Sequence, residues 1–324
     1  MIGYLLRRLA GLLPVLAAAV TLVWVLMIAL PGDPARLIAG GQSADPGIVG
    51  AIRAEWGLDR PMPAQFAAYL GRLLCGDLGT SYLQERPVAA VIGDHLVPTL
   101  VLALAATLLA SAGGVTLGCL AAARRGRLTD ALVLGASLLG ASAPVFWIGL
   151  LLIVLFASRL HWLPVAGYGL EGAIIPGIGA RLPEWDHLVL PASTLALVSM
   201  GAIARVTRAA LLDTAAAAFA TTARARGASR LRVFLQHGLR NALVPVVTVL
   251  GLNLAGLLGG AVATEYVFAW PGLGKAMVRA IALRDLPVVE GCVLVLTLIY
   301  VLASLAVDLL YPVLDPRLAE PPPG

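Results

Sequence analysis

The segment TTARARGASRLRVFLQHGLRN, residues 221–241, carries the densest group of side chains that could do chemistry in this chain. Five arginines fall within 17 residues: Arg224, Arg226, Arg230, Arg232 and Arg240. Guanidinium groups bind phosphates and carboxylates, so the segment suits an anionic lipid surface, a protein partner or a nucleic acid. Nucleic acid is disfavoured because base stacking needs aromatic side chains, and only Phe219 and Phe234 occur here. On the residues alone, a role in lipid contact or topology and a protein partner are equally favoured.

Other patterns that resemble cofactor sites lack the residues that such sites need. GYGLEG (167–172) has the spacing of a dinucleotide fingerprint without its strand and helix, and PGLGKAM (271–277) lacks the first glycine and the Mg²⁺-binding hydroxyl of a phosphate-binding loop. The four histidines are scattered and the three cysteines occur singly, which predicts neither a metal site nor a disulfide framework. The sequence shows no set of residues that could act together as nucleophile, general base and oxyanion donors of a catalytic site. We expect a non-catalytic chain with no metal and no bound cofactor of its own.

The elements that must position the basic segment are membrane-spanning helices. The 324 residues are 60% hydrophobic and 13% charged, and the mean hydropathy is +0.91. A span needs about 20 apolar residues, and six segments approach or exceed this length: 9–30, 96–123, 131–158, 188–212, 241–264 and about 288–311. The sequence therefore predicts an all-α fold, a polytopic membrane helix bundle with about six transmembrane helices.

The distribution of basic residues predicts the orientation of these spans. With the N-terminus inside, the cytoplasmic pieces are 1–8, 124–130, 205–240 and 312–324, and they hold 13 of the 23 basic residues. Lysine and arginine are retained on the cytoplasmic side, so both termini are predicted to be cytoplasmic. Arg205 and Arg208, at the inner end of the fourth span, are expected to snorkel to the interface. The first, second, third and fifth spans carry no charge near their middle, which disfavours ion-coupled transport.

The chain is expected to divide into residues 1–30, a cytoplasmic stub with the first helix; 31–95, an extracytoplasmic segment; 96–312, a five-helix core that includes the cytoplasmic segment 213–240; and 313–324, a cytoplasmic tail. Helical spacing in the second part predicts a short amphipathic helix with the apolar residues Phe66, Tyr69, Leu70, Leu73 and Leu74. Two pairs of glycines four residues apart, Gly114 with Gly118 and Gly256 with Gly260, predict close helix packing. Gly227 predicts a turn between two short helices within 213–240.

Residues 222–251, TARARGASRLRVFLQHGLRNALVPVVTVLG, resemble the EAA-type cytoplasmic loop of binding-protein-dependent ABC importer permeases of the dipeptide/oligopeptide/nickel subgroup. Further motifs follow in the order of that subgroup: RRL (7–9), PGDP (31–34), GLDRP (57–61), GDLGTSY (76–82), RPV (86–88), FAWPGLGKAM (268–277) and RDLPVVEG (284–291). The resemblance covers almost the whole chain. It implies a type I ABC importer permease fold in a bacterial-type cytoplasmic (inner) membrane. The implied function is half of a translocation pathway for di- or oligopeptides; nickel, glutathione or another small solute is the alternative, and an ion-coupled secondary transporter is the rival from another class.

The resemblance also implies partners and site residues. The partners are a second homologous permease, two cytoplasmic subunits that bind ATP and Mg, an extracytoplasmic solute-binding protein and membrane lipid, with no nucleic acid. The implied ATPase-coupling residues are Phe219, Ala223, Arg224, Arg226, Gly227, Arg232, His237, Arg240 and Asn241. The extracytoplasmic family motifs contribute Gly76, Asp77, Gly79, Trp270, Pro271, Gly272, Gly274, Arg284 and Asp285. The chain departs from the subgroup at 217–221 (AAFAT), which lacks the usual acidic and basic residues, and at Leu286 and Glu290, which replace Tyr and Gln.

Overall fold

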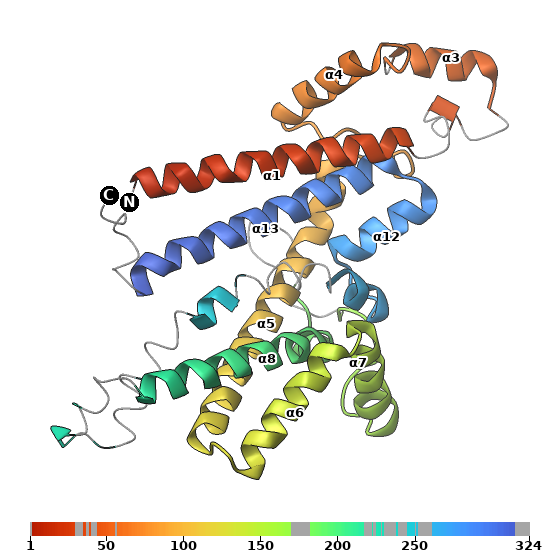
Figure 1. Cartoon of the computed structure of the whole chain (residues 1–324). Coiled ribbons are helices and arrows are strands. Elements are labelled where there is room, and N and C mark those ends of the chain that lie inside the picture. Colours follow the sequence, from red (N-terminus) through yellow and green to blue (C-terminus); the bar gives the residue numbers. More distant parts are fainter. Residues whose placement is uncertain are drawn as a thin grey trace. The chain divides into compact units, whose positions relative to one another are not determined.

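Helices make up the regular structure of the chain wherever the computed structural model describes it (Figure 1). The described residues are 2–29, 35, 36, 39, 44–55, 57–169, 182–216, 222, 225–227, 229, 238, 245–249, 251 and 261–314. Among them the only strand-like pairing is an isolated bridge between Thr80 and Pro87. The all-α prediction is confirmed. The contacts divide the chain into two compact units, each made of segments that are not consecutive in the sequence.

One unit comprises residues 10–96 and 276–298. Its helices are most of α1 (Ile2–Ala29), α3 (Pro46–Glu55) and α4 (Met62–Leu74), with parts of α5 (Val88–Ala123), α12 (Leu273–Leu283) and α13 (Leu286–Leu314). The predicted amphipathic helix is α4, and its Phe66 ring lies 4.8 Å from the Trp24 ring of α1, measured between centroids. Leu74 does not belong to the packed stripe, because it is the last residue of α4 and is 87% exposed.

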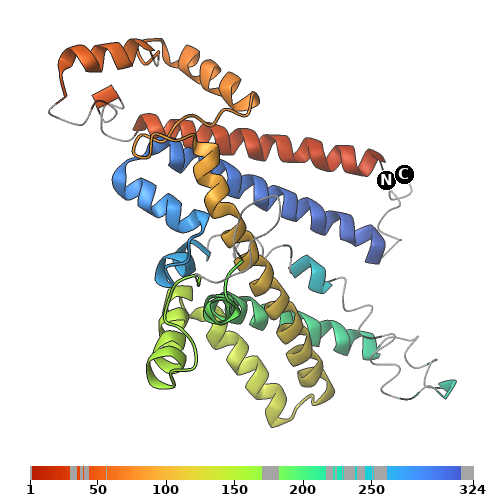
Figure 2. The same cartoon turned by 180° about the vertical axis from the view of Figure 1, so that it is seen from behind.

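The other unit comprises residues 1–9, 97–275 and 299–324. Within it α5 crosses α8 (Trp185–Ala216), as both views show (Figures 1 and 2). A Cβ atom placed on Gly114 would lie 2.6 Å from Ile203 Cβ, and one on Gly118 would lie 2.7 Å from the Ala204 carbonyl oxygen. Only glycine allows so close an approach of the two backbones. The close packing predicted for this pair is confirmed, whereas Gly256 and Gly260 lie outside the described residues.

The third predicted span, residues 131–158, is wrong as one continuous helix. α6 (Leu128–Ser142) ends before Pro144, and α7 (Val145–Leu152) with the π-helix η1 (Ile153–Arg159) continues after a bend of 111°. Pro144 has no N–H to donate to the preceding turn, and its ring disfavours helical backbone at the residue before it. Ala143 is accordingly extended, with φ −81° and ψ 138°. Together the two pieces pass as one broken span by length and composition.

Three single helices are long and apolar enough to cross a membrane: Val88–Ala123, Trp185–Ala215 and Leu286–Val307. The bent pair raises this number to four within the described part of the chain. The helix α1 is 28 residues long, and Leu13–Val25 is a shorter apolar helix within it. Most of the predicted span 241–264 lies outside the described residues. The count of six spans therefore stays a prediction.

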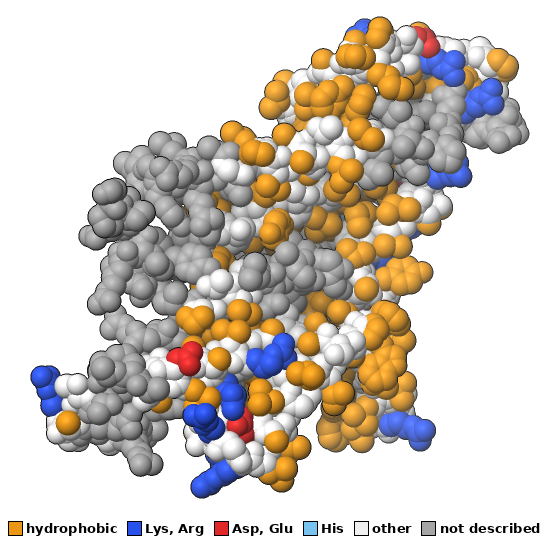
Figure 3. Space-filling model, in the orientation of Figure 1, with side chains coloured by type: hydrophobic (Ala, Val, Ile, Leu, Met, Phe, Trp, Pro, Cys, Tyr) orange, Lys and Arg blue, Asp and Glu red, His pale blue; other side chains and the backbone are white. Residues whose placement is uncertain are grey.

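Large apolar side chains point outward from these helices. Hydrophobic side chains gather over α6 and α7 in Figure 3, where Leu138, Leu139, Phe146 and Trp147 are all exposed. Apolar patches of this extent are uncommon on soluble monomers. The exposed residues agree with helices that are surrounded by lipid.

Candidate functional site

The GDLGTSY motif forms a compact turn after α4. Gly76 and Gly79 have φ values of +78° and +82°, left-handed conformations that glycine adopts without steric cost. The Asp77 Oδ1 atom accepts the Gly79 N–H at 2.9 Å, and the Val88 N–H donates to the Gly79 carbonyl at 2.9 Å. The motif residues therefore close the loop onto the first residue of α5.

Asp285 joins this turn to the start of α13. Ser81 Oγ donates to Asp285 Oδ2 at 2.5 Å, and the Tyr82 N–H donates to Asp285 Oδ1 at 3.1 Å. Asp285 is buried, so its two oxygens depend on these donors. Arg284 beside it is exposed and has a φ of +59°. Two predicted motifs, separated by about 200 positions, thus meet at one carboxylate.

Glu290, one of the departures from the subgroup, lies on α13 beyond this junction. Its carboxyl is buried, and Oε1 has no hydrogen-bond partner. Burial, and secondarily the charge of Glu290, raises the pKa of the Tyr69 and Tyr82 hydroxyls well above their ordinary value. Both phenols therefore stay neutral at physiological pH. Two neutral phenols therefore lie within electrostatic range of a buried acid, at a position where the subgroup carries an amide.

In the other unit the FAWPGLGKAM motif wraps around Glu265. This side chain is fully buried. Its Oε1 accepts the Thr99 hydroxyl at 2.7 Å, its Oε2 accepts the Lys275 N–H at 3.0 Å, and the Gly274 N–H also bonds to the carboxylate. Thr99 Oγ in turn accepts the Leu273 N–H at 2.8 Å. The first three N–H groups of α12 therefore all have partners, and a carboxylate lies where the helix dipole favours negative charge.

Close packing around Glu265 explains the glycines and the tryptophan of the motif. A Cβ atom on Gly272 would overlap the Glu265 carboxylate, and one on Gly274 would lie 2.6 Å from Val262 Cα. Trp270 is fully buried; its Nε1–H donates to the Pro98 carbonyl at 3.0 Å and its backbone N–H to the Glu265 carbonyl at 2.8 Å. The structure thus brings Trp270, Gly272 and Gly274 together, with Pro271 between them.

Sequence reasoning missed Glu265. Its position was the available signal, because it directly follows the apolar run 241–264 and precedes a turn rich in glycine. An acid in that place suits a helix N-terminus. Its contact with Thr99, 166 positions away, has no sequence signal.

The loop before α8 packs on the same motif. The Gly167 N–H donates to the Phe268 carbonyl at 2.8 Å, and the Tyr168 ring stands edge-on to the Trp270 ring at 4.7 Å. Burial raises the pKa of Tyr168 to about 12. The GYG residues therefore serve packing, in an irregular loop rather than a dinucleotide site.

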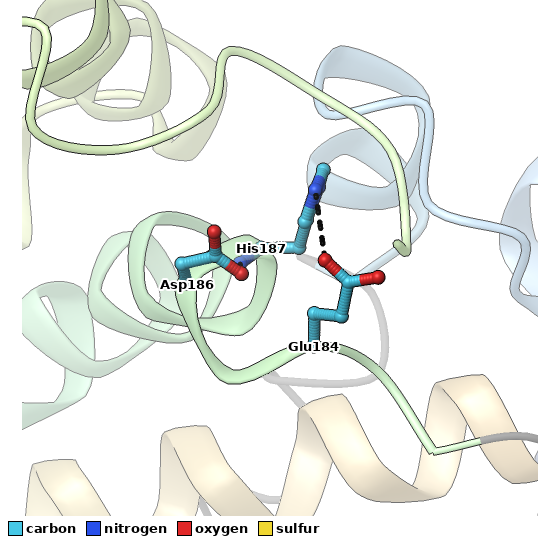
Figure 4. A group of neighbouring side chains, drawn as sticks. All are labelled: Glu184, Asp186 and His187. Atoms are coloured by element: carbon cyan, nitrogen blue, oxygen red, sulfur yellow. Dashed lines mark hydrogen bonds and ion pairs between the residues drawn. The ribbon is translucent and has the colours of Figure 1, made fainter. Parts of the chain in front are cut away.

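Glu184, Asp186 and His187 gather at the N-terminus of α8 (Figure 4). One ligand atom from each lies within 4.8 Å of the others. However, Asp186 Oδ1 already accepts the His187 backbone N–H at 2.9 Å, and His187 Nε2 lies 3.9 Å from Glu184 Oε2. Carboxylates at a helix N-terminus stabilise its dipole, and we interpret the group in this way. The expectation of no metal stays a prediction.

The arginines near the end of α8 bond to α6, and their predicted position at the membrane interface stays a prediction. Arg208 forms a two-point ion pair with buried Asp130 of α6: Nε to Oδ1 at 2.6 Å and Nη2 to Oδ2 at 2.8 Å. Arg205 Nη1 donates to the Ser137 carbonyl at 3.0 Å. These bonds tie α8 to α6, because an apolar environment favours a paired charge over an unpaired one.

Most of the predicted coupling residues lie outside the described residues: Phe219, Ala223, Arg224, Arg232, His237, Arg240 and Asn241. Arg226 and Gly227 are described and exposed. The Arg226 N–H donates to the Thr222 carbonyl at 3.1 Å, and Gly227 follows with a φ of +83°. A Cβ atom on Gly227 would meet nothing within 4 Å, so only the backbone conformation favours glycine. The turn agrees with the prediction, and its role in coupling stays a prediction.

Comparison with protein families gives two matches that together cover nearly all of the chain. Residues 114–320 match the binding-protein-dependent transport system inner membrane component. Residues 1–103 match the N-terminal component of the same membrane proteins. The first match alone covers more than half of the chain.

Curated relatives match over their full length. The chain is 40% identical over 318 residues to the glutathione transport system permease protein GsiC of Salmonella paratyphi A and to that of Salmonella typhimurium, and 39% identical to that of Escherichia coli K12. Each match covers 98% of this chain and 99% of the relative. The chain therefore belongs to the binding-protein-dependent inner membrane component family, and it is a non-catalytic permease subunit of a bacterial ABC importer.

Proposed function

We propose that this permease forms half of a translocation pathway for small peptides. The observation that carries the proposal is similarity over 98% of the chain to permeases named for glutathione, which is itself a small peptide. Import of peptides and import of glutathione thus require the same kind of recognition, that of a short chain with charged ends. Nickel or another small solute remains the alternative within the subgroup.

The assembly that we propose follows from the family. A second homologous permease completes the pathway, two cytoplasmic subunits bind ATP and Mg, and an extracytoplasmic solute-binding protein delivers the cargo. Both termini lie in the cytoplasm. The placement of basic residues in the short loops supports this orientation.

Segment 213–240 is proposed as the contact with the ATPases. It begins in the last turn of α8, which Arg208 ties to α6 through Asp130. A push on the segment would therefore reach two helices of the bundle rather than one. The left-handed turn at Gly227 supports the proposal because it lets a short segment reverse between two helical pieces.

Substitution of Gly227 tests the coupling role. Proline requires a φ near −65°, so Gly227→Pro cannot keep the turn, and we expect membrane insertion to persist while uptake and transport-coupled ATP hydrolysis collapse. Gly227→Ala is the milder variant, because a left-handed alanine costs about 1–2 kcal/mol. Gly57→Ala is the matched control: Gly57 has a φ of +66° and its added Cβ would meet only the Arg60 side chain. Normal uptake by Gly227→Pro would contradict the coupling role.

The cargo is tested with the assembled transporter and its solute-binding protein in liposomes. Dipeptides, an oligopeptide, glutathione and Ni²⁺ are compared for stimulation of ATP hydrolysis. We expect stimulation by a peptide or by glutathione. Stimulation by Ni²⁺ alone would reject peptide cargo while leaving the permease assignment intact, because ATP hydrolysis would still be coupled to uptake.

A further inference from the structure

The tip of the α5–α6 hairpin, residues 124–127 (RRGR), is a strongly basic surface. Arg124, Arg125 and Arg127 are all exposed. Gly126 between them has a φ of +75° and reverses the chain in a tight turn. Three guanidinium groups are thereby held at one end of the hairpin.

The acid that lies closest to these arginines along the chain is already engaged. Asp130 accepts two bonds from Arg208 and a third, at 3.0 Å, from the Gly126 N–H. Its charge still attracts Arg125 at longer range. In the part of the chain that the structure describes, none of the three tip arginines forms an ion pair with a carboxylate. The tip therefore keeps most of its positive charge for a partner outside the chain.

An apolar surface adjoins the basic tip. Leu120 at the end of α5 is 46% exposed, and Leu128 and Leu132 at the start of α6 are 75% and 61% exposed. Leu128 and Leu132 are four positions apart, so they share one face of the helix. Figure 3 shows basic side chains with hydrophobic ones beside them at this end of α6.

We propose that the hairpin tip binds an anionic phospholipid. The arginines hold the phosphate headgroup, and Leu128 and Leu132 contact the acyl chains beneath it. An acidic protein surface would complement the arginines and leave the adjoining leucines uncovered, whereas one phospholipid complements both. The proposal rests on the membrane location of the family and is independent of the cargo.

The size of the effect follows from the charge. Each arginine near an anionic membrane surface strengthens binding roughly fivefold. Loss of all three should therefore weaken the preference for anionic over zwitterionic lipid by on the order of 100-fold at low salt. Added salt should reduce the preference, because the headgroup contacts are exposed to solvent.

The test uses the full permease purified with its partner subunits. Native mass spectrometry counts bound lipid while phosphatidylglycerol or phosphatidylcholine is titrated. The variant R124Q/R125Q/R127Q is compared with the matched control R53Q/R60Q/R86Q, which removes three basic charges from residues 53–86. We expect the tip variant to lose the phosphatidylglycerol preference and the control to keep it. Equal loss in both variants, or no preference in the unaltered protein, would overturn the proposal.

A second variant separates lipid from a protein partner. L128N/L132N keeps the arginines and removes the acyl contact, so it should weaken binding of phosphatidylglycerol but not release the ATPases. Free glycerol phosphate should not compete with the lipid, because it lacks acyl chains. If the arginine variant instead loses its ATPase subunits and retains its lipid preference, the tip is a protein-docking surface and the lipid proposal fails.

Discussion

Removal of the Glu265 carboxylate should destabilise the part of the core where α12 begins more than any other loss of one acidic side chain described here. Glu265→Ala leaves three donors without their acceptor: the Thr99 hydroxyl and the N–H groups of Gly274 and Lys275. Each buried donor that loses its partner costs about 1–3 kcal/mol. Loss of the buried charge offsets part of this cost, so we expect a net destabilisation of roughly 3–5 kcal/mol.

The stability of the Glu265→Gln variant should fall between that of the unaltered protein and that of Glu265→Ala. Its amide oxygen can accept the N–H groups of Gly274 and Lys275, and its NH₂ can donate to Thr99 Oγ. The charge-assisted part of the bonds is lost, which corresponds to about 1–2 kcal/mol. The order of stability should be Glu, then Gln, then Ala.

Thermal unfolding of the purified permease in one detergent measures this order. For a protein of this size the alanine variant should melt roughly 10 °C lower and the glutamine variant a few degrees lower. Asp94→Ala is the control, since Asp94 forms only an exposed ion pair with Arg86, which is worth about 1 kcal/mol or less. If Glu265→Ala melts like Asp94→Ala, the network around Glu265 does not stabilise the core and the reasoning is refuted.

Three further contacts give testable expectations. Gly118→Ala should lower the melting temperature by several degrees, because its Cβ would lie 2.7 Å from a backbone oxygen of α8 and overpacking costs about 1–3 kcal/mol. Arg208→Gln removes the cation that bonds to both oxygens of Asp130, and we expect a lower melting temperature, measured by thermal unfolding. Ser81→Ala removes one of the two donors to Asp285 and should raise hydrogen exchange in the 76–88 turn about tenfold, for a loss of about 1.4 kcal/mol.

Each of these three variants has its own control. Gly135→Ala, on α6, adds a Cβ that meets nothing within 4 Å and should be neutral or stabilising, so equal losses at both glycines would argue against close packing. The double variant of Arg208 and Asp130, each changed to leucine, should recover much of the stability lost in Arg208→Gln. No recovery would mean that the ion pair is not the cause. Unchanged exchange in Ser81→Ala would show that Asp285 does not hold the turn.

Sequence reasoning succeeded where the information is local. Hydropathy and length identify the α8 and α13 spans within about four residues, because lipid demands an uninterrupted apolar stretch. The predicted span of α5 ends at the right residue but begins eight residues late. Left-handed backbone at Gly76, Gly79 and Gly227 matches positions where glycine stands in a motif. Pro144 is visible in the sequence, but the prediction of one span over 131–158 includes it in a continuous helix. The 111° bend that follows it depends on whether neighbouring elements satisfy the freed carbonyls, and no sequence pattern reports that.

By itself the sequence determined that this is a multi-pass membrane protein of the ABC importer permease family, because composition and ordered motifs are properties of the chain alone. Only the tertiary structure decided what the motifs do. Glu265 and Thr99 are 166 positions apart, and Ser81 and Asp285 are 204 apart. Each pair meets only because the fold brings distant segments of the chain together. Arg208 pairs with Asp130, because the packing of α8 on α6 places a carboxylate within its reach. The role of a side chain depends on the residues that it contacts, and the tertiary structure determines those contacts.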